Sequence, residues 1–147
     1  MVGRVSRPPE HPGLPSEVEA VVELPRGTLV KRRANGTVDF VSPLPCPYNY
    51  GSIPGLEGGD GDAQDALVLG PRLARGARVR LPVRAVVGFV DAGRIDDKLV
   101  LSSRPLTAVD RRAIALFFEA YALFKRALNG VRGEAGPTCS EGLRVTG

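Results

Sequence analysis

The sequence predicts an α+β fold, a small β-barrel with one helix near the C-terminal end. Two observations carry this prediction. Short β-type runs separated by glycine and proline fill the first two thirds of the chain, and a long stretch after residue 107 has the apolar spacing of an amphipathic helix. Strand runs that follow one another without helices between them favour a small barrel over a parallel α/β sheet.

Residues 1–18 are rich in proline, so we expect an extended N-terminal arm there. Residues 19–147 are long enough to bury a core of their own, and we expect a single domain. The strand runs are expected at residues 20–24, 29–33, 37–42, 66–69, 77–81, 83–90 and 98–101. Asn35-Gly36 joins the second run to the third, and Asn-Gly is typical of a hairpin turn because both residues tolerate positive φ.

The expected helix begins after Thr107, where the sequence resembles a capping box with Asp110 in the place of the usual Glu. An apolar stripe at helical spacing follows, formed by Ile114, Phe117, Phe118, Tyr121, Phe124 and Leu128. Asn129-Gly130 is expected to end this helix. The tail from residue 133 to residue 147 predicts no element.

Composition argues against several classes of function. The hydrophobic content of 43% and the charged content of 24% are ordinary for a soluble globular protein. No apolar run approaches membrane-spanning length and no signal peptide is visible, so we expect a cytoplasmic protein without a membrane partner. The net charge of +4 comes from arginines spread along the chain with few aromatics among them, which does not favour nucleic acid. A basic surface suits an anionic small substrate.

Two acidic clusters stand out as candidates for chemistry. Asp60, Asp62 and Asp65 lie close together in a glycine-rich segment, and Asp91 and Asp96 form a second cluster. Ionised carboxylates in one site raise each other's pKa, and a hard divalent cation removes that conflict. Oxygen ligands of this kind suit Mg²⁺, with Mn²⁺ as the alternative metal. A solvated acidic turn is the other interpretation, because Asp and Gly also favour turns for backbone reasons.

Other site chemistries fit the sequence poorly. His11 is the only histidine and lies in the proline-rich arm, which argues against a zinc site and against a histidine-activated nucleophile. An EF-hand loop starting at Asp60 needs Gly at its sixth position and Glu at its twelfth, where this chain has Asp65 and Pro71. Cys46 and Cys139 are too few to imply a disulfide framework.

Three local motifs occur in a joint register over about residues 19–125. They are Val22-Glu23-Leu24-Pro25 with Lys31 eight residues after Glu23, Cys46-Pro47-Tyr48-Asn49-Tyr50-Gly51 ahead of the first acidic cluster, and the segment from Asp91 to Lys98. In this order and spacing the chain resembles the family I soluble inorganic pyrophosphatases. The resemblance implies a small five-stranded OB-like barrel and Mg²⁺-dependent hydrolysis of pyrophosphate to two phosphates. It also implies a homo-oligomer, since bacterial members of the family assemble as hexamers.

The resemblance also implies roles, carried over by motif position. The expected metal ligands are Asp60, Asp65, Asp96, Asp91 and Glu23, of which the first three would hold the metals that bind the attacking water. Asp62 matches the base that accepts the proton of that water. The expected phosphate-binding groups are Lys31, Tyr50, Lys98 and Tyr121, and the first three of these are also expected to be catalytic. Lysines and phenols of this kind offset charge on a leaving phosphate.

The chain departs from the family pattern mainly at phosphate-binding positions. The strand arginine is absent, and Ala122 replaces the lysine expected after Tyr121. Gln64 is an unexpected residue between the second and third aspartates. We expect Arg33 to bind substrate in compensation, because a guanidinium binds phosphate at least as well as an ammonium. Two alternatives stay open: a phosphohydrolase of another anhydride or ester, and a catalytically weak metal- or phosphate-binding homologue.

Overall fold

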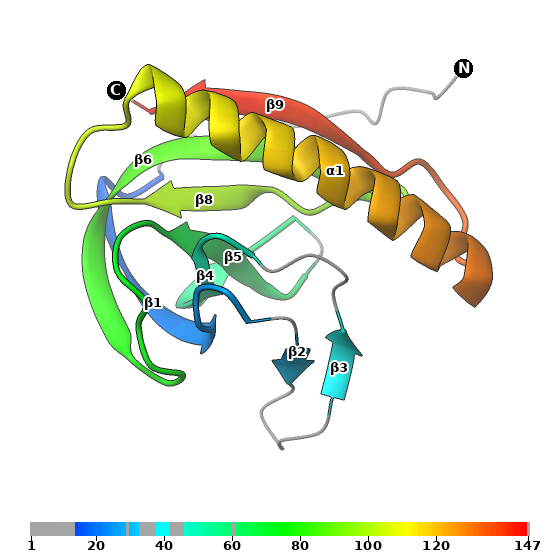
Figure 1. Cartoon of the computed structure of the whole chain (residues 1–147), viewed down its shortest axis with the longest axis horizontal. Helices are drawn as coiled ribbons and strands as arrows, with labels where there is room; N and C mark the ends of the chain where they lie inside the picture. Colours follow the sequence, from blue (N-terminus) through cyan, green and yellow to red (C-terminus); the bar gives the residue numbers. More distant parts are fainter. Residues whose placement is uncertain (1–13, 29, 33–37, 42–45, 60, 147) are drawn as a thin grey trace.

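The computed structural model describes residues 14–146 except residues 29, 33–37, 42–45 and 60 (Figure 1). In this part of the chain it has nine strands and one helix. For the two short strands β2 (Val30–Arg32) and β3 (Val38–Val41) it describes only the backbone pairing, which is antiparallel. This pairing agrees with the expected hairpin, whereas Asn35-Gly36 lies outside the described residues.

Five strands close into a barrel. Their order around the ring is β1 (Glu17–Leu24), β4 (Asn49–Glu57), β5 (Ala63–Val68), β8 (Lys98–Leu101) and β6 (Arg78–Asp91), and β6 pairs back with β1. All neighbours in the ring are antiparallel except β5 and β8, which are parallel. The prediction of a five-stranded OB-like barrel with a C-terminal helix is confirmed.

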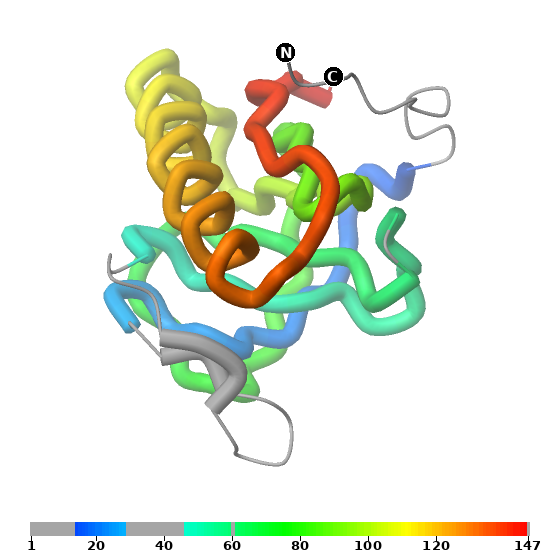
Figure 2. The backbone as a smooth tube through the Cα atoms, turned by 90° about the vertical axis from the view of Figure 1, so that its right-hand side faces the viewer, coloured from blue at the N-terminus to red at the C-terminus, as the bar shows by residue number. Residues whose placement is uncertain are grey.

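The long strand β6 organises the rest of the sheet. It pairs with β7 (Arg94–Ile95) through a tight hairpin and with β9 (Cys139–Val145) along its second half. Figures 1 and 2 both show β9 running beside the helix α1 (Ala108–Arg132), which it also contacts. The tail after residue 133, for which the sequence predicted no element, therefore supplies a strand.

The structure corrects other strand predictions as well. The runs at 77–81 and 83–90 are one strand, because Pro82 lies where β6 changes partner from β1 to β8 and lacks the N–H that a ladder would need. β4 was missed altogether, since glycine, serine and proline hide its alternation. The predicted domain boundary at residue 19 stays a prediction, although β1 already begins at Glu17.

The helix begins as predicted and ends later. The Thr107 hydroxyl accepts a hydrogen bond from Asp110 N at 3.0 Å, and Asp110 Oδ2 accepts one from Thr107 N at 2.9 Å, so the capping box is complete. The predicted stop at Asn129-Gly130 is wrong, because Gly133 with φ 71° provides the C-cap. No helix among the described residues is long and apolar enough to cross a membrane.

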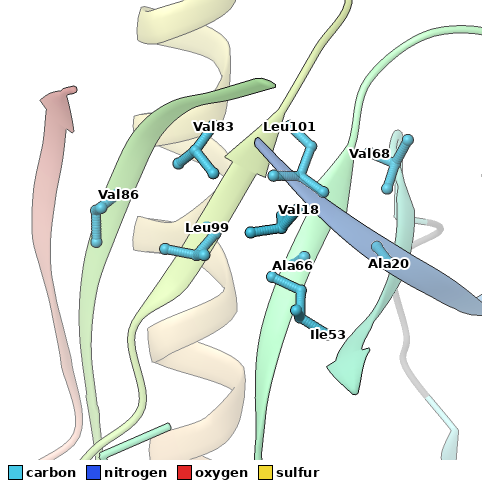
Figure 3. Close-up of a cluster of buried hydrophobic side chains, with 9 residues drawn as sticks. All are labelled: Val18, Ala20, Ile53, Ala66, Val68, Val83, Val86, Leu99 and Leu101. Carbon is cyan, nitrogen blue, oxygen red and sulfur yellow. The ribbon is translucent and has the colours of Figure 1, made fainter. Parts of the chain in front are cut away.

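The strands present two different faces. Inside the barrel lies an apolar cluster formed by Val18, Ala20, Ile53, Ala66, Val68, Val83, Val86, Leu99 and Leu101 (Figure 3). On the opposite face, under α1, lies a second cluster formed by Leu67, Ala85, Val87, Phe89, Val100, Ile114, Phe118 and Ala122. Successive strand residues alternate between faces. Side chains two residues from Leu67 or Val100 therefore emerge on the helix-covered face.

Candidate active site

A row of polar side chains crosses four neighbouring strands on the helix-covered face. Ser52 pairs in register with Asp65, and Asp65 pairs in register with Lys98. On the other side, Ser52 Oγ donates a hydrogen bond to Glu23 Oε1 at 2.7 Å. Cross-strand partners point to the same side of a sheet. The barrel thus assembles Glu23 and Lys98, from its first and last strands in this row, on one surface.

Gly51 allows the close contact between β1 and β4 beside this row. A Cβ atom at Gly51 would lie 2.0 Å from the carbonyl oxygen of Val21, which no side chain can tolerate. The glycine after Tyr50 in the second sequence motif therefore has a packing reason. It lets Tyr50 and Ser52 approach the strand that carries Glu23.

The centre of the row is the buried Lys98. Its side chain is 2% exposed, and Nζ lies 2.7 Å from Asp65 Oδ2 and 2.8 Å from Asp96 Oδ2. Burial alone lowers the pKa of a lysine, but the two carboxylates outweigh it and hold the pKa of Lys98 above its ordinary value. The ammonium group stays charged throughout the neutral range.

The pKa of Asp96 indicates that the single ammonium of Lys98 does not balance the negative charge of this cluster. Its pKa is raised to about 6, first by burial and further by the neighbouring Asp65, although Lys98 opposes the shift. Two partly buried carboxylates beside a single lysine leave an excess of negative charge. The cluster has the electrostatic character of a site for an additional cation.

Two phenols border the cluster. Burial is the first cause that raises the pKa of Tyr50 well above its ordinary value, followed by the charges of Asp65 and Asp96. Burial also raises the pKa of Tyr121 to about 12, with Lys98 opposing and Asp96 assisting. Lys98 Nζ lies 5.7 Å from the centre of the Tyr50 ring. Both phenols stay neutral at physiological pH and can donate a hydrogen bond to an anion.

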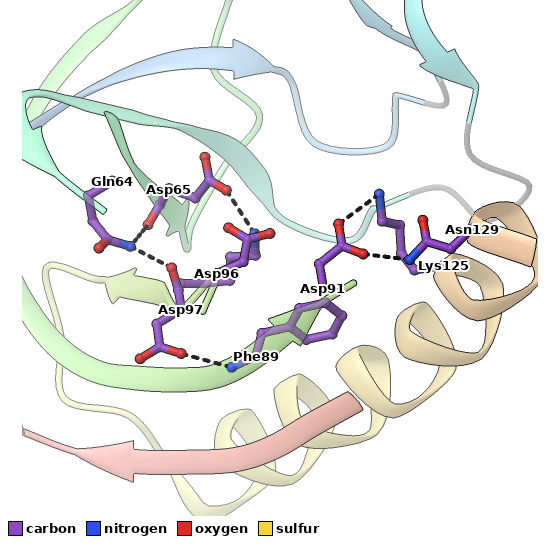
Figure 4. Close-up of polar contacts among 9 residues, drawn as sticks. Gln64, Asp65, Phe89, Asp91, Asp96, Asp97, Lys125 and Asn129 are labelled. Carbon is purple, nitrogen blue, oxygen red and sulfur yellow. Dashed lines mark hydrogen bonds and ion pairs between the residues drawn. The ribbon is translucent and has the colours of Figure 1, made fainter. Parts of the chain in front are cut away.

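A second lysine–carboxylate centre lies at the end of β6 (Figure 4). Lys125 Nζ is 3.2 Å from Asp91 Oδ2, and Asn129 Nδ2 donates to Asp91 Oδ1 at 2.7 Å. Asn129 is buried and also donates to Thr138 Oγ1 at 3.0 Å. The helix α1 therefore fixes the orientation of Asp91 from one side.

The hairpin between β6 and β7 brings the two acidic groups of the second cluster to the same end of the barrel. Ala92 and Gly93 both have positive φ, 49° and 81°, as a tight two-residue hairpin turn requires. After β7 the chain returns to β6, where Asp96 N donates to Phe89 O at 2.9 Å. Asp91 and Asp96 thus flank the hairpin at its base.

Gln64 and Asp97 hold the segment that carries Asp96. Gln64 Nε2 donates to the carbonyl oxygen of Asp97, and Asp97 Oδ1 accepts from Phe89 N at 2.9 Å. Both side chains are buried. Gln64, which the sequence marked only as a departure from the family, is a structural residue that precedes Asp65 on the other face of β5.

Several predicted site residues stay untested by this geometry. Asp62 lies exposed in the bend before β5, and Lys31 is described only through its backbone pairing with Phe40. Asp60 and Arg33 lie outside the described residues. Within the residues that are described, no three His, Cys, Asp or Glu side chains gather closely enough to hold a metal ion. The assigned roles of these residues remain predictions.

A hollow of about 600 Å³ lies elsewhere in the described part of the molecule and holds none of the predicted site residues. It is formed by residues 14–16, residues 82–84 and 86 of β6, and residues 144–146. We therefore place the candidate site at the polar row, where the charged groups converge.

Lys125 and Asn129 are the site residues that the sequence did not single out. Both follow Tyr121 at intervals of four residues, so they lie on the same side of the helix as that phenol. This spacing is visible in the sequence. Asn129 was instead interpreted as part of the helix stop, and Lys125 belongs to none of the three motifs.

Comparisons with known proteins identify the family of this chain. A protein-family model described as inorganic pyrophosphatase matches residues 20–134. The inorganic pyrophosphatase of Gluconobacter oxydans is 30% identical over 130 residues, which cover 74% of this chain and 75% of that protein. The soluble inorganic pyrophosphatase of Oryza sativa subsp. indica is 35% identical over 97 residues, which cover 60% of this chain but only 45% of that protein.

Solved structures give the same answer for the fold. The crystal structure of an inorganic pyrophosphatase from Neisseria gonorrhoeae superimposes with a TM-score of 0.68 and 26% sequence identity. The match covers 88% of this chain and 83% of that structure. Together with the family model, which spans more than half of the sequence, these similarities show that the chain belongs to the inorganic pyrophosphatase family.

Proposed function

We propose that this protein hydrolyses inorganic pyrophosphate to two phosphates and that the reaction depends on Mg²⁺. The observation that carries the proposal is the polar row with Lys98 between Asp65 and Asp96, bordered by two neutral phenols, in a chain of the pyrophosphatase family. Carboxylates for cations and cationic or phenolic donors for phosphate oxygens are the two requirements of phosphoryl transfer.

The donor chemistry of the site fits a hard divalent ion. The described candidates, Glu23, Asp65, Asp91 and Asp96, offer only carboxylate oxygens, which Mg²⁺ prefers. The raised pKa of Asp96 supports this fit, because an added cation would relieve the excess negative charge beside Asp65. When bound, Mg²⁺ supplies a nucleophilic water of lowered pKa and neutralises charge on the phosphates. Mn²⁺ has the same ligand preferences and is the expected substitute.

The residues of the chain then divide the work. Asp62 accepts the proton of the attacking water, for which its exposed position in the bend before β5 leaves access. Tyr50, Tyr121 and Lys98 donate hydrogen bonds to phosphate oxygens and offset the charge that develops on the leaving phosphate. Lys31 is assigned to phosphate binding on its motif position alone.

Measurement of phosphate release from pyrophosphate with and without Mg²⁺ tests the proposal. We expect release only in the presence of Mg²⁺ or a similar divalent ion. Faster turnover of nucleotides or phosphate esters than of pyrophosphate would favour a phosphohydrolase of another substrate. No release over a broad range of Mg²⁺ concentration and pH would favour a binding homologue.

The expected homo-oligomer has a candidate surface on the outer face of α1. Val109, Leu116, Leu123 and Val131 are 78%, 59%, 63% and 88% exposed on the side of the helix that points away from the buried residues. A surface helix normally presents polar residues on that side. We propose that a second copy of this chain covers the stripe.

Charge along the edge of the stripe suits a second copy in antiparallel orientation. Arg112, Glu119 and Arg126 alternate in sign at intervals of seven residues, so a copy shifted by one interval pairs opposite charges. Light scattering on a sizing column tests this assignment. We expect Leu116→Glu combined with Leu123→Glu to give monomers, and Arg111→Glu, on the same helix, to leave the oligomer intact. A monomeric unmodified chain would contradict it.

A further inference from the structure

Lys125 lies one helical turn from the position where the family pattern has a lysine that this chain lacks. The family pattern places a lysine directly after Tyr121, but this chain has Ala122, which is 1% exposed in the core beneath the helix. The Ala122 methyl group packs in this cluster and carries no charge. In this chain, position 122 therefore delivers no charge to the acidic clusters.

The next helical position on the face of Tyr121 is residue 125. Residues four apart lie one above the other on a helix, so Lys125 extends the side that carries the Tyr121 phenol. The charges of Lys98, Asp96 and Asp91 all act on the Tyr121 phenol, so both lysine–carboxylate centres lie within electrostatic reach of it. The Lys125 ammonium reaches Asp91 at 3.2 Å (Figure 4).

Asp91 does not depend on Lys125 for its orientation. Asn129 holds Asp91 Oδ1 at 2.7 Å, and the buried Asn129 is itself fixed by Thr138. Lys125 contacts the other oxygen, Oδ2, with a side chain that is 15% exposed. A lysine with access to solvent and a carboxylate held by another residue can exchange partners without disturbing the fold.

We propose that Lys125 is a phosphate-binding residue that supplies, from one helical turn further on, the ammonium group that Ala122 cannot provide. Without substrate its ammonium pairs with Asp91, and with substrate it contacts a phosphate oxygen while Asp91 is available to a cation. The proposal rests on the proposed function, because it takes pyrophosphate as the substrate. The chemical logic is the exchange of one anionic partner for another of higher charge.

The test measures binding separately from hydrolysis. Titration calorimetry with methylenediphosphonate, a diphosphate analogue that water does not cleave at its bridge, is carried out on the full chain with saturating Mg²⁺. We expect Lys125→Gln to weaken binding roughly tenfold or more, the usual effect of removing a charge-assisted hydrogen bond. Lys125→Arg should keep most of the affinity. Arg111→Gln removes the same charge from an exposed position of the same helix, outside the proposed contact between copies, and should bind like the unmodified chain.

A second titration separates phosphate binding from support of Asp91. Mn²⁺ is added to the chain without diphosphonate, and we expect Lys125→Gln to bind it at least as tightly as the unmodified chain, because no ammonium competes for Asp91 Oδ2. A loss of Mn²⁺ affinity, or equal diphosphonate affinity in Lys125→Gln and Arg111→Gln, would overturn the proposal. Diphosphonate binding by an unmodified chain that does not hydrolyse pyrophosphate would overturn the proposed function and leave the assignment of Lys125 intact.

Discussion

The two lysine–carboxylate centres at this end of the barrel differ in how firmly they are held. Lys98 extends from a barrel strand, is 2% exposed and contacts the carboxylates of Asp65 and Asp96. Lys125 extends from the helix, is 15% exposed and contacts Asp91. The first centre therefore has a fully buried lysine between two carboxylates, and the second has a less buried lysine beside one carboxylate.

The difference follows from the elements that carry them. Asp65 and Lys98 face each other across a parallel ladder that continues through Val68 and Leu101, so their separation is set by backbone pairing. Lys125 reaches Asp91 through a long side chain alone, and the backbone contact between α1 and this end of β6 is indirect, through Asn129 and Thr138. A buried pair in a ladder suits permanent organisation of charge, and a solvent-accessible pair suits exchange with a ligand.

The largest effect is expected from replacing Asp62, the proposed base, and Asp65, the proposed metal ligand beside Lys98, one at a time. Asp62→Asn should lower the turnover of pyrophosphate by on the order of 10²–10⁴, the range for removal of a general base, and leave metal affinity nearly unchanged. Asp65→Asn should weaken metal binding, because it removes a ligand beside Lys98. Calorimetric titration of Mn²⁺ into both variants checks the division. Equal losses of Mn²⁺ affinity would reject it.

Replacement of each lysine by methionine compares the two centres directly. Lys98→Met leaves two partly buried carboxylates without their cation, and we expect the free energy of unfolding to fall by about 3–5 kcal/mol in metal-free protein. Lys125→Met should cost less than Lys98→Met, because Lys125 is less buried and Asn129 still donates a hydrogen bond to its one carboxylate partner, Asp91. Urea unfolding of both variants gives the numbers. Similar losses would show that burial does not separate the centres.

The pH dependence of stability sharpens the description of the centre around Lys98. Asp96 has a folded-state pKa of about 6, above its ordinary value of 3.8, so between these pH values the folded chain binds more protons than the unfolded chain. The stability contribution of Asp96 is present below about pH 4 and is lost as the pH rises to about 6. Its size is on the order of 1–3 kcal/mol.

Urea midpoints of metal-free protein at about pH 4 and pH 7 measure this contribution. We expect Asp96→Asn to gain stability over the unmodified chain at pH 7 relative to pH 4, because the amide does not titrate. Saturating Mg²⁺ should reduce the difference between the two proteins' pH profiles. Parallel profiles without metal would show that the pKa of Asp96 is not raised in the folded chain.

The last comparison concerns Arg33, an expected substrate-binding cation that lies outside the described residues. If Arg33 contacts substrate, Arg33→Ala should raise the KM for pyrophosphate roughly ten- to hundredfold, equivalent to about 1.5–3 kcal/mol. Arg32→Ala is the matched control, because in the strand that the sequence predicts at residues 29–33 neighbouring side chains would point to opposite faces. An unchanged KM in Arg33→Ala would leave Lys31, Lys98 and Lys125 as the cations to which substrate affinity must be traced.

Much of the fold was readable because local rules and tertiary structure agree. The capping box at Thr107 formed as predicted, since both of its hydrogen bonds lie within four residues. β4 and β9 were not readable, because glycine and serine in both strands, and proline in β4, hide the alternation. Their pairing with β1 and β6 respectively joins segments well separated in the sequence. The helix end failed because Asn129 is engaged with Asp91 and Thr138, which no local signal shows.

The sequence predicted those site residues that belong to a motif, and it missed those whose role depends on how the strands and the helix pack. The sequence pointed to Asp65, Asp96 and Lys98, and the parallel pairing of β5 with β8 brings them together. That Lys98 would be buried between two carboxylates depends on this pairing and cannot be seen in the sequence. The four-residue spacing of Lys125 from Tyr121 is visible in the sequence. The contact of Lys125 with Asp91, at the end of β6, is visible only in the structure.

The parallel β5–β8 pair also has a consequence for biosynthesis. β6 is made between β5 and β8, so the edge of β5 that carries Asp65 leaves the ribosome about thirty residues before its partner strand. Such an open edge invites pairing with another nascent chain, and natural proteins discourage this with charged side chains. Asp65, and Asp62 just ahead of the strand, place negative charge on the exposed segment. The carboxylates that the proposed function requires are thus also the kind of side chain that discourages pairing of an open strand edge, until Lys98 pairs with Asp65.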